Sequence, residues 1–236
     1  MTELGATEAE SAAPEAAEAA ADCPQCRKPA ELCLCSEIVQ RPNKVALIVL
    51  QHPQEQDREL GSARLATLLL SNARLRIGLS WPNLSKAIGR PADPKRWAVL
   101  YLGPTRLSAE AMQQKVLVLD KKAEPLPADR AADALGDLEG VILLDGSWAQ
   151  AKTLWWRNPW LLKCWRVALN PPWPSRYGRL RKEPRRDSVS TIEAAALILG
   201  YLENSPETER HLLKGFEKLL QRYRETRTGA KAKAAI

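Results

Sequence analysis

The 236-residue chain is 45% hydrophobic and 27% charged, which is typical of one folded domain of catalytic size with a small addition. Its apolar runs are far shorter than the roughly 20 residues of a membrane-spanning helix, and no signal-peptide pattern opens the chain. We therefore expect no membrane span and a cytoplasmic protein. Taking the six acids of residues 1–22 out of the net charge of +7 leaves +13 for residues 23–236. This basic body favours a polyanionic partner such as nucleic acid over a charge that serves solubility alone.

Four segments differ in composition along the chain. Residues 1–22 are rich in alanine and glutamate with almost nothing bulky, so we predict a disordered acidic tail. Residues 23–41 hold four of the five cysteines and form a predicted zinc-binding segment. Residues 42–224 form the predicted catalytic domain. Residues 225–236 are basic and rich in small residues, and are predicted to be a flexible tail.

The catalytic segment alternates between apolar runs of strand length and stretches with helical periodicity. The predicted strands cover residues 45–50, 97–102, 115–119, 141–144 and 165–169, and the predicted helices cover 59–71, 147–157, 191–203 and a last helix from Pro206. This order predicts an α/β fold with a mostly parallel sheet flanked by helices. Ligands bind such sheets at the carboxyl ends of the strands, so the loops that follow the strands are candidates for the functional site.

The four clustered cysteines have the composition of a closed metal site. They lie within a thirteen-residue window, and four thiolates can surround one zinc ion tetrahedrally. The single-residue gap between the last two is tighter than the usual spacing, and four unligated thiols or a redox pair are the alternatives. The predicted ligands of a structural zinc ion are Cys23, Cys26, Cys33 and Cys35. The remaining cysteine, Cys164, is expected to be a small buried apolar residue.

The most informative loop follows the strand at 141–144. Asp145 ends that strand beside a glycine, which is a favourable place for a group that accepts or donates protons. The alternative is that Asp145 only ties the turn together. Ser147 and Gln150 form a capping box that starts a helix, and Ser190 and Glu193 repeat this pattern. Two helix N-termini near strand ends would offer free N–H groups and positive dipole ends to a ligand carboxylate.

A basic loop precedes the second capping box. It carries one acid, Glu183, among Arg176, Arg179, Arg181, Lys182, Arg185 and Arg186. Such a cluster suits phosphate contacts. A charge run is usually a solvated face, but Gly178, Pro184 and the proline-rich lead-in at 171–174 indicate a shaped loop, so we favour RNA contact. Six of the eight tryptophans lie between positions 148 and 173. Trp155, Trp156 and Trp160 are able to stack on unpaired bases, but packing against the core is the interpretation we prefer for most of them.

Several common catalytic motifs are absent from the sequence. It contains no G-x-G-x-x-G, no P-loop and no H-E-x-x-H. With two histidines, His52 and His211, chemistry built on several histidines is disfavoured. A dinucleotide-binding Rossmann site and a Walker-type NTPase are therefore both poor interpretations.

Residues 145–152 read Asp-Gly-Ser-Trp-Ala-Gln-Ala-Lys and resemble the signature of the DTW-domain family, D-x-T-W followed by Q-A-(K/R). Ser147 stands where the signature has threonine and keeps the hydroxyl. Other blocks resemble the family in the same order along residues 23–203: Cys-Leu-Cys at 33–35, Gln-His-Pro-Gln-Glu at 51–55, Ala-Arg-Leu at 63–65, Asn-Ala at 72–73, Tyr-Leu-Gly at 101–103, Leu-Arg-Lys-Glu-Pro at 180–184 and Val-Ser-Thr-Ile-Glu-Ala at 189–194.

The resemblance implies a SPOUT-like fold with a C-terminal knot that binds S-adenosylmethionine. It also implies transfer of the 3-amino-3-carboxypropyl group of that molecule to N3 of a tRNA uridine, with release of methylthioadenosine. Asp145 is then the candidate to accept or orient the N3 proton. The residues expected to bind S-adenosylmethionine are Leu102, Gly103, Leu144, Gly146, Ser147, Trp148, Arg181, Lys182, Ser190, Thr191 and Glu193. Those expected to contact tRNA are His52, Glu55, Arg64, Arg176, Arg179, Arg185 and Arg186.

Two other functions compete with this one. A SPOUT-type RNA methyltransferase would use the same donor and release S-adenosylhomocysteine instead of methylthioadenosine. A zinc-stapled RNA-binding module without catalysis would bind tRNA and show no dependence on S-adenosylmethionine. The D-x-(T/S)-W block separates the aminocarboxypropyl transfer from the methyltransferase. In a non-catalytic module, Asp145 and the capped loops would have no particular purpose.

Overall fold

The computed structural model describes residues 22–56, 58–101, 113–181 and 188–233. In these residues the chain forms one six-stranded sheet in the order β2-β1-β5-β3-β6-β4. Five strands run parallel to one another, and β4 pairs with β6 in the antiparallel sense. The strands are β1 (Ala46–Gln51), β2 (Ala73–Ile77), β3 (Trp97–Leu100), β4 (Val116–Leu119), β5 (Gly140–Asp145) and β6 (Trp165–Leu169).

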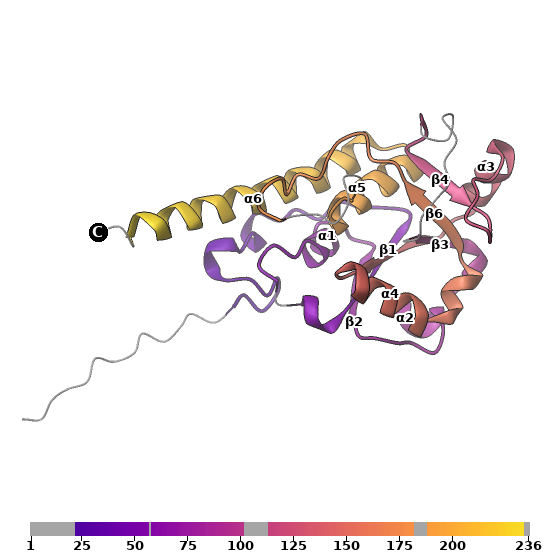
Figure 1. Ribbon diagram of the computed structural model, residues 1–236, viewed down its shortest axis with the longest axis horizontal. Helices are drawn as coiled ribbons and strands as arrows, with labels where there is room; N and C mark the ends of the chain where they lie inside the picture. Colours follow the sequence, from indigo (N-terminus) through magenta and orange to yellow (C-terminus); the bar gives the residue numbers. More distant parts are fainter. Residues whose placement is uncertain (1–21, 57, 102–112, 182–187, 234–236) are drawn as a thin grey trace, which may run out of the picture.

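Helices cover both faces of this sheet (Figure 1). One layer contains α1, α5 and α6, and the other contains α2 and α4. The α-helices are α1 (Ala63–Leu68), α2 (Leu84–Ile88), α3 (Ala128–Gly136), α4 (Trp148–Arg157), α5 (Thr191–Leu202) and α6 (Pro206–Lys233). The short 3-10 helices are η1 (Ala30–Leu32), η2 (Cys35–Glu37), η3 (Pro53–Glu55), η4 (Pro94–Arg96) and η6 (Pro159–Lys163).

The central strands are apolar on both faces because each face lies against helices. In β1, Leu47 and Val49 pack toward α1, α5 and α6, whereas Ile48 and Leu50 pack toward α2 and α4. All four side chains are buried. A continuous apolar run is what a parallel strand covered on both sides requires.

The predicted α/β class with a mostly parallel sheet is confirmed, and all five predicted strands occur with ends shifted by few residues. The helix expected over 59–71 is shorter, at Ala63–Leu68, and the last helix extends beyond Arg224 to Lys233. Among the strands and α-helices of the described residues, β2, α2 and α3 were not predicted. The SPOUT-like class and its knot stay predictions. Within the described ranges, none of the helices has both the length and the apolar character needed to cross a membrane.

Gly140 provides a test of how closely this sheet is packed. A Cβ atom added at Gly140 would lie 2.4 Å from the ring of the fully buried Trp97 on the adjacent β3. We expect Gly140→Ala to lower the free energy of unfolding by about 1–3 kcal/mol, because a filled core accepts no extra methyl group.

Urea denaturation followed by circular dichroism measures this change. Gly136→Ala is the control, because nothing lies within 4 Å of the added Cβ at the end of α3. It should leave the unfolding midpoint unchanged or slightly raised. Equal midpoints for Gly140→Ala and the wild type would contradict the packing at the β3–β5 pair.

Candidate active site

The carboxyl ends of β1 and β5 place Asp145 opposite Gln51. Nε2 of Gln51 donates a 2.8 Å hydrogen bond to Oδ2 of Asp145, and the hydroxyl of Thr191, the first residue of α5, donates to Oδ1. The backbone N–H of His52 donates to the Asp145 carbonyl oxygen at 2.9 Å. Asp145 is therefore held by two segments that are far from it in the sequence, residues 51–52 and the start of α5, at the carboxyl edge of the sheet, where parallel α/β proteins bind ligands.

The turn after Asp145 starts α4 through the predicted capping box. The Ser147 hydroxyl accepts from the backbone N–H of Gln150 at 3.4 Å, and Oε1 of Gln150 accepts from the Ser147 N–H at 2.6 Å. Nε2 of Gln150 also donates to Oε1 of Gln54 at 3.2 Å, which links this turn to the segment after β1. Gly146 is required here, because a Cβ would lie 2.8 Å from Cβ of Gln150. The first turn of α4 thus approaches the end of β1 closely.

The second predicted capping box starts α5 and has a further role. The fully buried carboxylate of Glu193 accepts from the Ser190 N–H at 2.8 Å and from the Ser190 hydroxyl at 2.6 Å. It also accepts from the Ser175 hydroxyl at 2.9 Å and the Arg176 N–H at 2.7 Å. The sequence placed Glu193 among the residues expected to bind S-adenosylmethionine. In the structure its carboxylate bonds to Ser190 at the start of α5 and to the segment at 175–176.

Two residues expected to bind different partners lie together. Glu55 is buried, and its carboxylate is 3.9 Å from the Arg181 guanidinium and 3.8 Å from that of Arg58. Arg181 also stacks over the ring of Tyr177 at 5.5 Å, and the Tyr177 hydroxyl donates to the Leu60 carbonyl oxygen at 2.6 Å. Glu55 therefore anchors the basic loop to the segment after β1, and Arg181 keeps a half-exposed charge beside the site.

The other predicted site residues are distributed as follows. Leu144 is buried under α4, Trp148 is exposed at its first turn, and Nδ1 of His52 accepts from the Gln54 N–H at 3.3 Å. Arg176 pairs with Glu217 of α6, whereas Arg179 is exposed and Arg64 is half-buried on α1. Leu102, Gly103, Lys182, Arg185 and Arg186 lie outside the described residues.

Gln51 is the site residue that the sequence analysis missed. Its side chain is 3% exposed, and in the part of the chain that the structure describes its Oε1 atom has no hydrogen-bond partner. The signal was present, since Gln51 is the one polar residue that ends an otherwise apolar strand. Buried acceptors normally find a donor. An unpaired acceptor beside Asp145 is therefore consistent with a ligand that supplies a donor there.

The four clustered cysteines form a separate site that is suited to a metal ion. Their sulfur atoms all lie within 4.8 Å of one another, and all five cysteines of the chain are free thiols. Sγ of Cys23 lies 3.8 Å from Sγ of Cys35, which matches the edge of about 3.8 Å of a tetrahedron with zinc–sulfur bonds of about 2.3 Å. Backbone N–H groups of Cys26 and Gln25 lower the pKa of the Cys23 thiol to about 6. Burial raises the pKa of Cys26 and Cys35.

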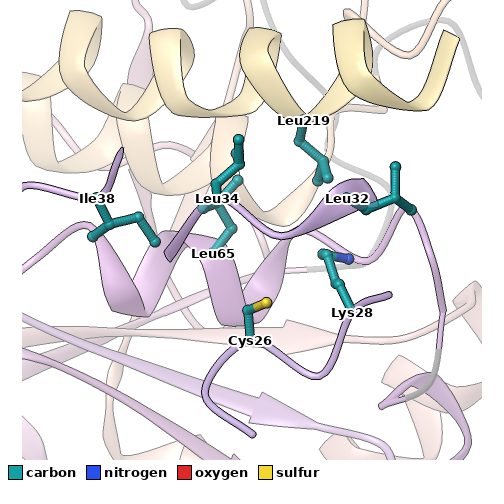
Figure 2. A pocket seen from close by; sticks show the side chains of 7 residues that line it. All are labelled: Cys26, Lys28, Leu32, Leu34, Ile38, Leu65 and Leu219. Carbon is teal, nitrogen blue, oxygen red and sulfur yellow. The ribbon is translucent and has the colours of Figure 1, made fainter. Parts of the chain in front are cut away.

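Packing connects this cysteine cluster to the main core. Leu32 and Leu34 are buried among Leu65 of α1 and Leu219 of α6 (Figure 2). Nζ of the buried Lys28 donates to the backbone carbonyl oxygen of Glu59, and burial lowers the pKa of this lysine to about 8. The cluster therefore supports the segment that precedes α1.

The family model of the DTW domain matches residues 20–224. The chain belongs to the DTW-domain family. It is 25% identical over 203 residues to the tRNA-uridine aminocarboxypropyltransferase 2 of Macaca fascicularis, and 28% identical over 210 residues to that of Mus musculus. These alignments cover 84% and 87% of this chain. The chain spans 62% and 64% of the length of these two relatives.

The tRNA-uridine aminocarboxypropyltransferase A of Arabidopsis thaliana is 28% identical over 221 residues, which are 84% of this chain and 79% of that protein. No solved structure matches the chain. The matched range includes the four cysteines, Gln51, Asp145 and both capping boxes. The candidate active site and the cysteine cluster therefore both lie within the DTW domain.

From the hydrogen bond between Gln51 and Asp145 we predict that the variant Gln51→Glu of this DTW domain has a stability that depends on pH. Gln51→Glu places a buried carboxyl group in hydrogen-bonding contact with the partly buried carboxyl group of Asp145, so one of them stays protonated and its folded-state pKa rises above the ordinary value of about 4.3. Because this carboxyl pKa is higher in the folded state than in the unfolded state, the free energy of unfolding is not reduced by ionisation below about pH 4. It falls as the pH rises through the folded-state pKa.

Urea unfolding at pH 5 and pH 7.5 measures this linkage. The free energy of unfolding of Gln51→Glu, relative to the wild type, should be lower at pH 7.5 than at pH 5. Gln54→Glu makes the same change at an exposed position and should show no added pH dependence. Parallel pH profiles for Gln51→Glu and Gln54→Glu would contradict the observed contact.

Counting reactive thiols tests the metal site. We expect about one zinc ion per chain, and none of the five thiols should react rapidly with a thiol reagent at pH 8. A strong chelator should release the metal and expose the four clustered cysteines. Cys164 should react only after denaturation, because it is buried and burial raises its pKa to about 12. Four fast-reacting thiols in metal-free, fully folded protein would contradict the assignment.

Proposed function

We propose that this DTW-domain protein transfers the 3-amino-3-carboxypropyl group of S-adenosylmethionine to N3 of a tRNA uridine. The observation that carries the proposal is Asp145, fixed by Gln51 and Thr191 at the carboxyl edge of the sheet and at the first turns of α4 and α5. The names of the relatives support the reaction class. A SPOUT-like class with a C-terminal knot belongs to the same proposal.

The residues around Asp145 have the chemistry that S-adenosylmethionine requires. The N-terminus of α4 offers N–H groups and a positive dipole end for its carboxylate, with Arg181 as a cation of the same loop region. The unpaired Oε1 of Gln51 suits its ammonium group or a uridine N–H. We assign Leu144, Gly146, Ser147, Trp148, Ser190 and Thr191 to this molecule, together with Leu102, Gly103 and Lys182 outside the described residues.

When bound, S-adenosylmethionine would supply the carbon next to its sulfonium; N3 would bond to that carbon as the carbon–sulfur bond breaks, with methylthioadenosine as the leaving group. Asp145 accepts or orients the N3 proton. Its two oxygens accept from Gln51 and Thr191, so its orientation is fixed before the substrate binds. A carboxylate in this position also stabilises positive charge near it. In this proposal the cysteine cluster holds a structural zinc ion, and His52, Arg64 and Arg179 contact the tRNA.

Asp145→Asn is the test of this mechanism. The amide keeps the shape of the side chain but accepts no proton, so the rate of transfer should fall by about 10²–10⁴-fold with the fold intact. The measurement incubates the protein with unmodified tRNA and S-adenosylmethionine, weighs the nucleosides after digestion and quantifies methylthioadenosine.

Asp133→Asn, on the exposed face of α3, is the matched control and should keep full activity. Turnover of Asp145→Asn close to that of the control would exclude Asp145 from the reaction. A gain of one methyl group in the RNA, with S-adenosylhomocysteine released, would identify a methyltransferase. Tight tRNA binding without any modification of several tRNAs would favour the RNA-binding module.

A further inference from the structure

The exposed face of α4 carries an unusual row of side chains. Trp148, Lys152 and Trp156 are spaced four residues apart and therefore lie on one face of the helix. The opposite face is buried through Ala151 and Leu154. Trp156 is 78% exposed and Trp148 is 38% exposed, whereas tryptophan normally contributes a large apolar surface to a core.

Cations alternate with aromatic rings along this helix. The Lys152 ammonium lies 5.6 Å from the ring centre of Trp148. At the edge of the same helix, Trp155 packs edge-on against Tyr101 with ring centres 5.9 Å apart, and the guanidinium of Arg166 lies 5.7 Å from each ring. Exposed rings with nearby cations are the combination that binds single-stranded nucleic acid, because rings stack on bases and cations pair with phosphates.

The row begins at the candidate active site. Trp148 is the first residue of α4 and follows the Asp145 turn directly. With a rise of about 1.5 Å per residue, Trp156 lies about 12 Å further along the helix axis. A strand whose uridine lies at Asp145 therefore has a neighbouring unpaired nucleotide within reach of Trp156.

We propose that Lys152 and Trp156, on the exposed face of α4 and next to Trp148 at the donor site, form a stacking platform for an unpaired nucleotide that flanks the modified uridine. The proposal rests on the proposed function, because that function supplies the RNA. A second copy of the chain fits this face less well. A symmetric contact would enclose the exposed cations Lys152 and Arg157 of both copies in one interface, and it would join two bodies that are both strongly basic.

Trp156→Leu tests the platform, because leucine keeps an apolar side chain but has no ring to stack. The probes are a fluorescently labelled unmodified tRNA transcript and a labelled, fully paired RNA duplex, both titrated by anisotropy at 0.15 M salt. Trp156→Leu should weaken tRNA binding about tenfold and leave duplex binding unchanged, since stacking needs an unpaired base. Trp156→Phe should keep most of the affinity.

The matched control is Tyr201→Leu, which removes an exposed ring from α5 and should leave both affinities unchanged. Unchanged tRNA affinity of Trp156→Leu overturns the platform. A dimer of the free wild type that Trp156→Leu converts to a monomer, with tRNA binding unaffected, assigns the face to a second copy and also overturns it.

The experiment distinguishes failure of the stacking platform from failure of the proposed transfer reaction. Binding that depends on Trp156 without release of methylthioadenosine supports the platform and contradicts the proposed reaction. Aminocarboxypropyl transfer by the wild type, with equal tRNA affinity in Trp156→Leu, supports the reaction and overturns the platform.

Discussion

The parallel pairing of β1 and β5 is the constraint on which the rest of the site depends. It places Gln51 opposite Asp145, and the hydrogen bond between their side chains follows from this register. A slip by one residue would turn every side chain of a strand to the other face. Such a slip is prevented because both faces of β1 and β5 contribute to packed apolar cores. The position of Asp145 is therefore determined by the packing of residues that have no chemical role.

Hydrogen bonds at the helix caps connect the ends of the strands to the surrounding loops. The Gln150 side chain caps α4 and also bonds Gln54, so the turn after β5 and the segment after β1 are joined. Glu193 likewise caps α5 and accepts from the Arg176 N–H, so the start of α5 and the segment at 175–176 are joined. A fully buried carboxylate needs compensating donors, and Glu193 receives them from the N–H and hydroxyl of Ser190 at the N-terminus of α5 and from Ser175 and Arg176. Its carboxylate therefore holds the start of α5 and the segment at 175–176 together.

The sequence predicted those features that local patterns encode. Apolar runs revealed the buried strands, and hydroxyl and acidic or amide residues at a fixed spacing revealed both caps. It missed β2, because Arg74 and Arg76 alternate with apolar residues in an edge strand that is only partly buried. It also missed Gln51, whose importance arises from its cross-strand partner 94 residues away. The contact between Glu55 and Arg181 depends on tertiary packing in the same way.

The cysteine cluster and the candidate active site are joined by backbone contacts. Lys28, between the two cysteine pairs, donates to the carbonyl oxygen of Glu59, and Tyr177 donates to that of Leu60. Tyr177 in turn lies under Arg181, which faces Glu55. None of these contacts brings a cysteine atom near Asp145. A metal ion held by the cysteines would therefore affect the candidate active site indirectly, by fixing the backbone of residues 58–60. A metal ion that links the four cysteines would stabilise this segment, because its few apolar residues are buried against α1 and α6 rather than against one another.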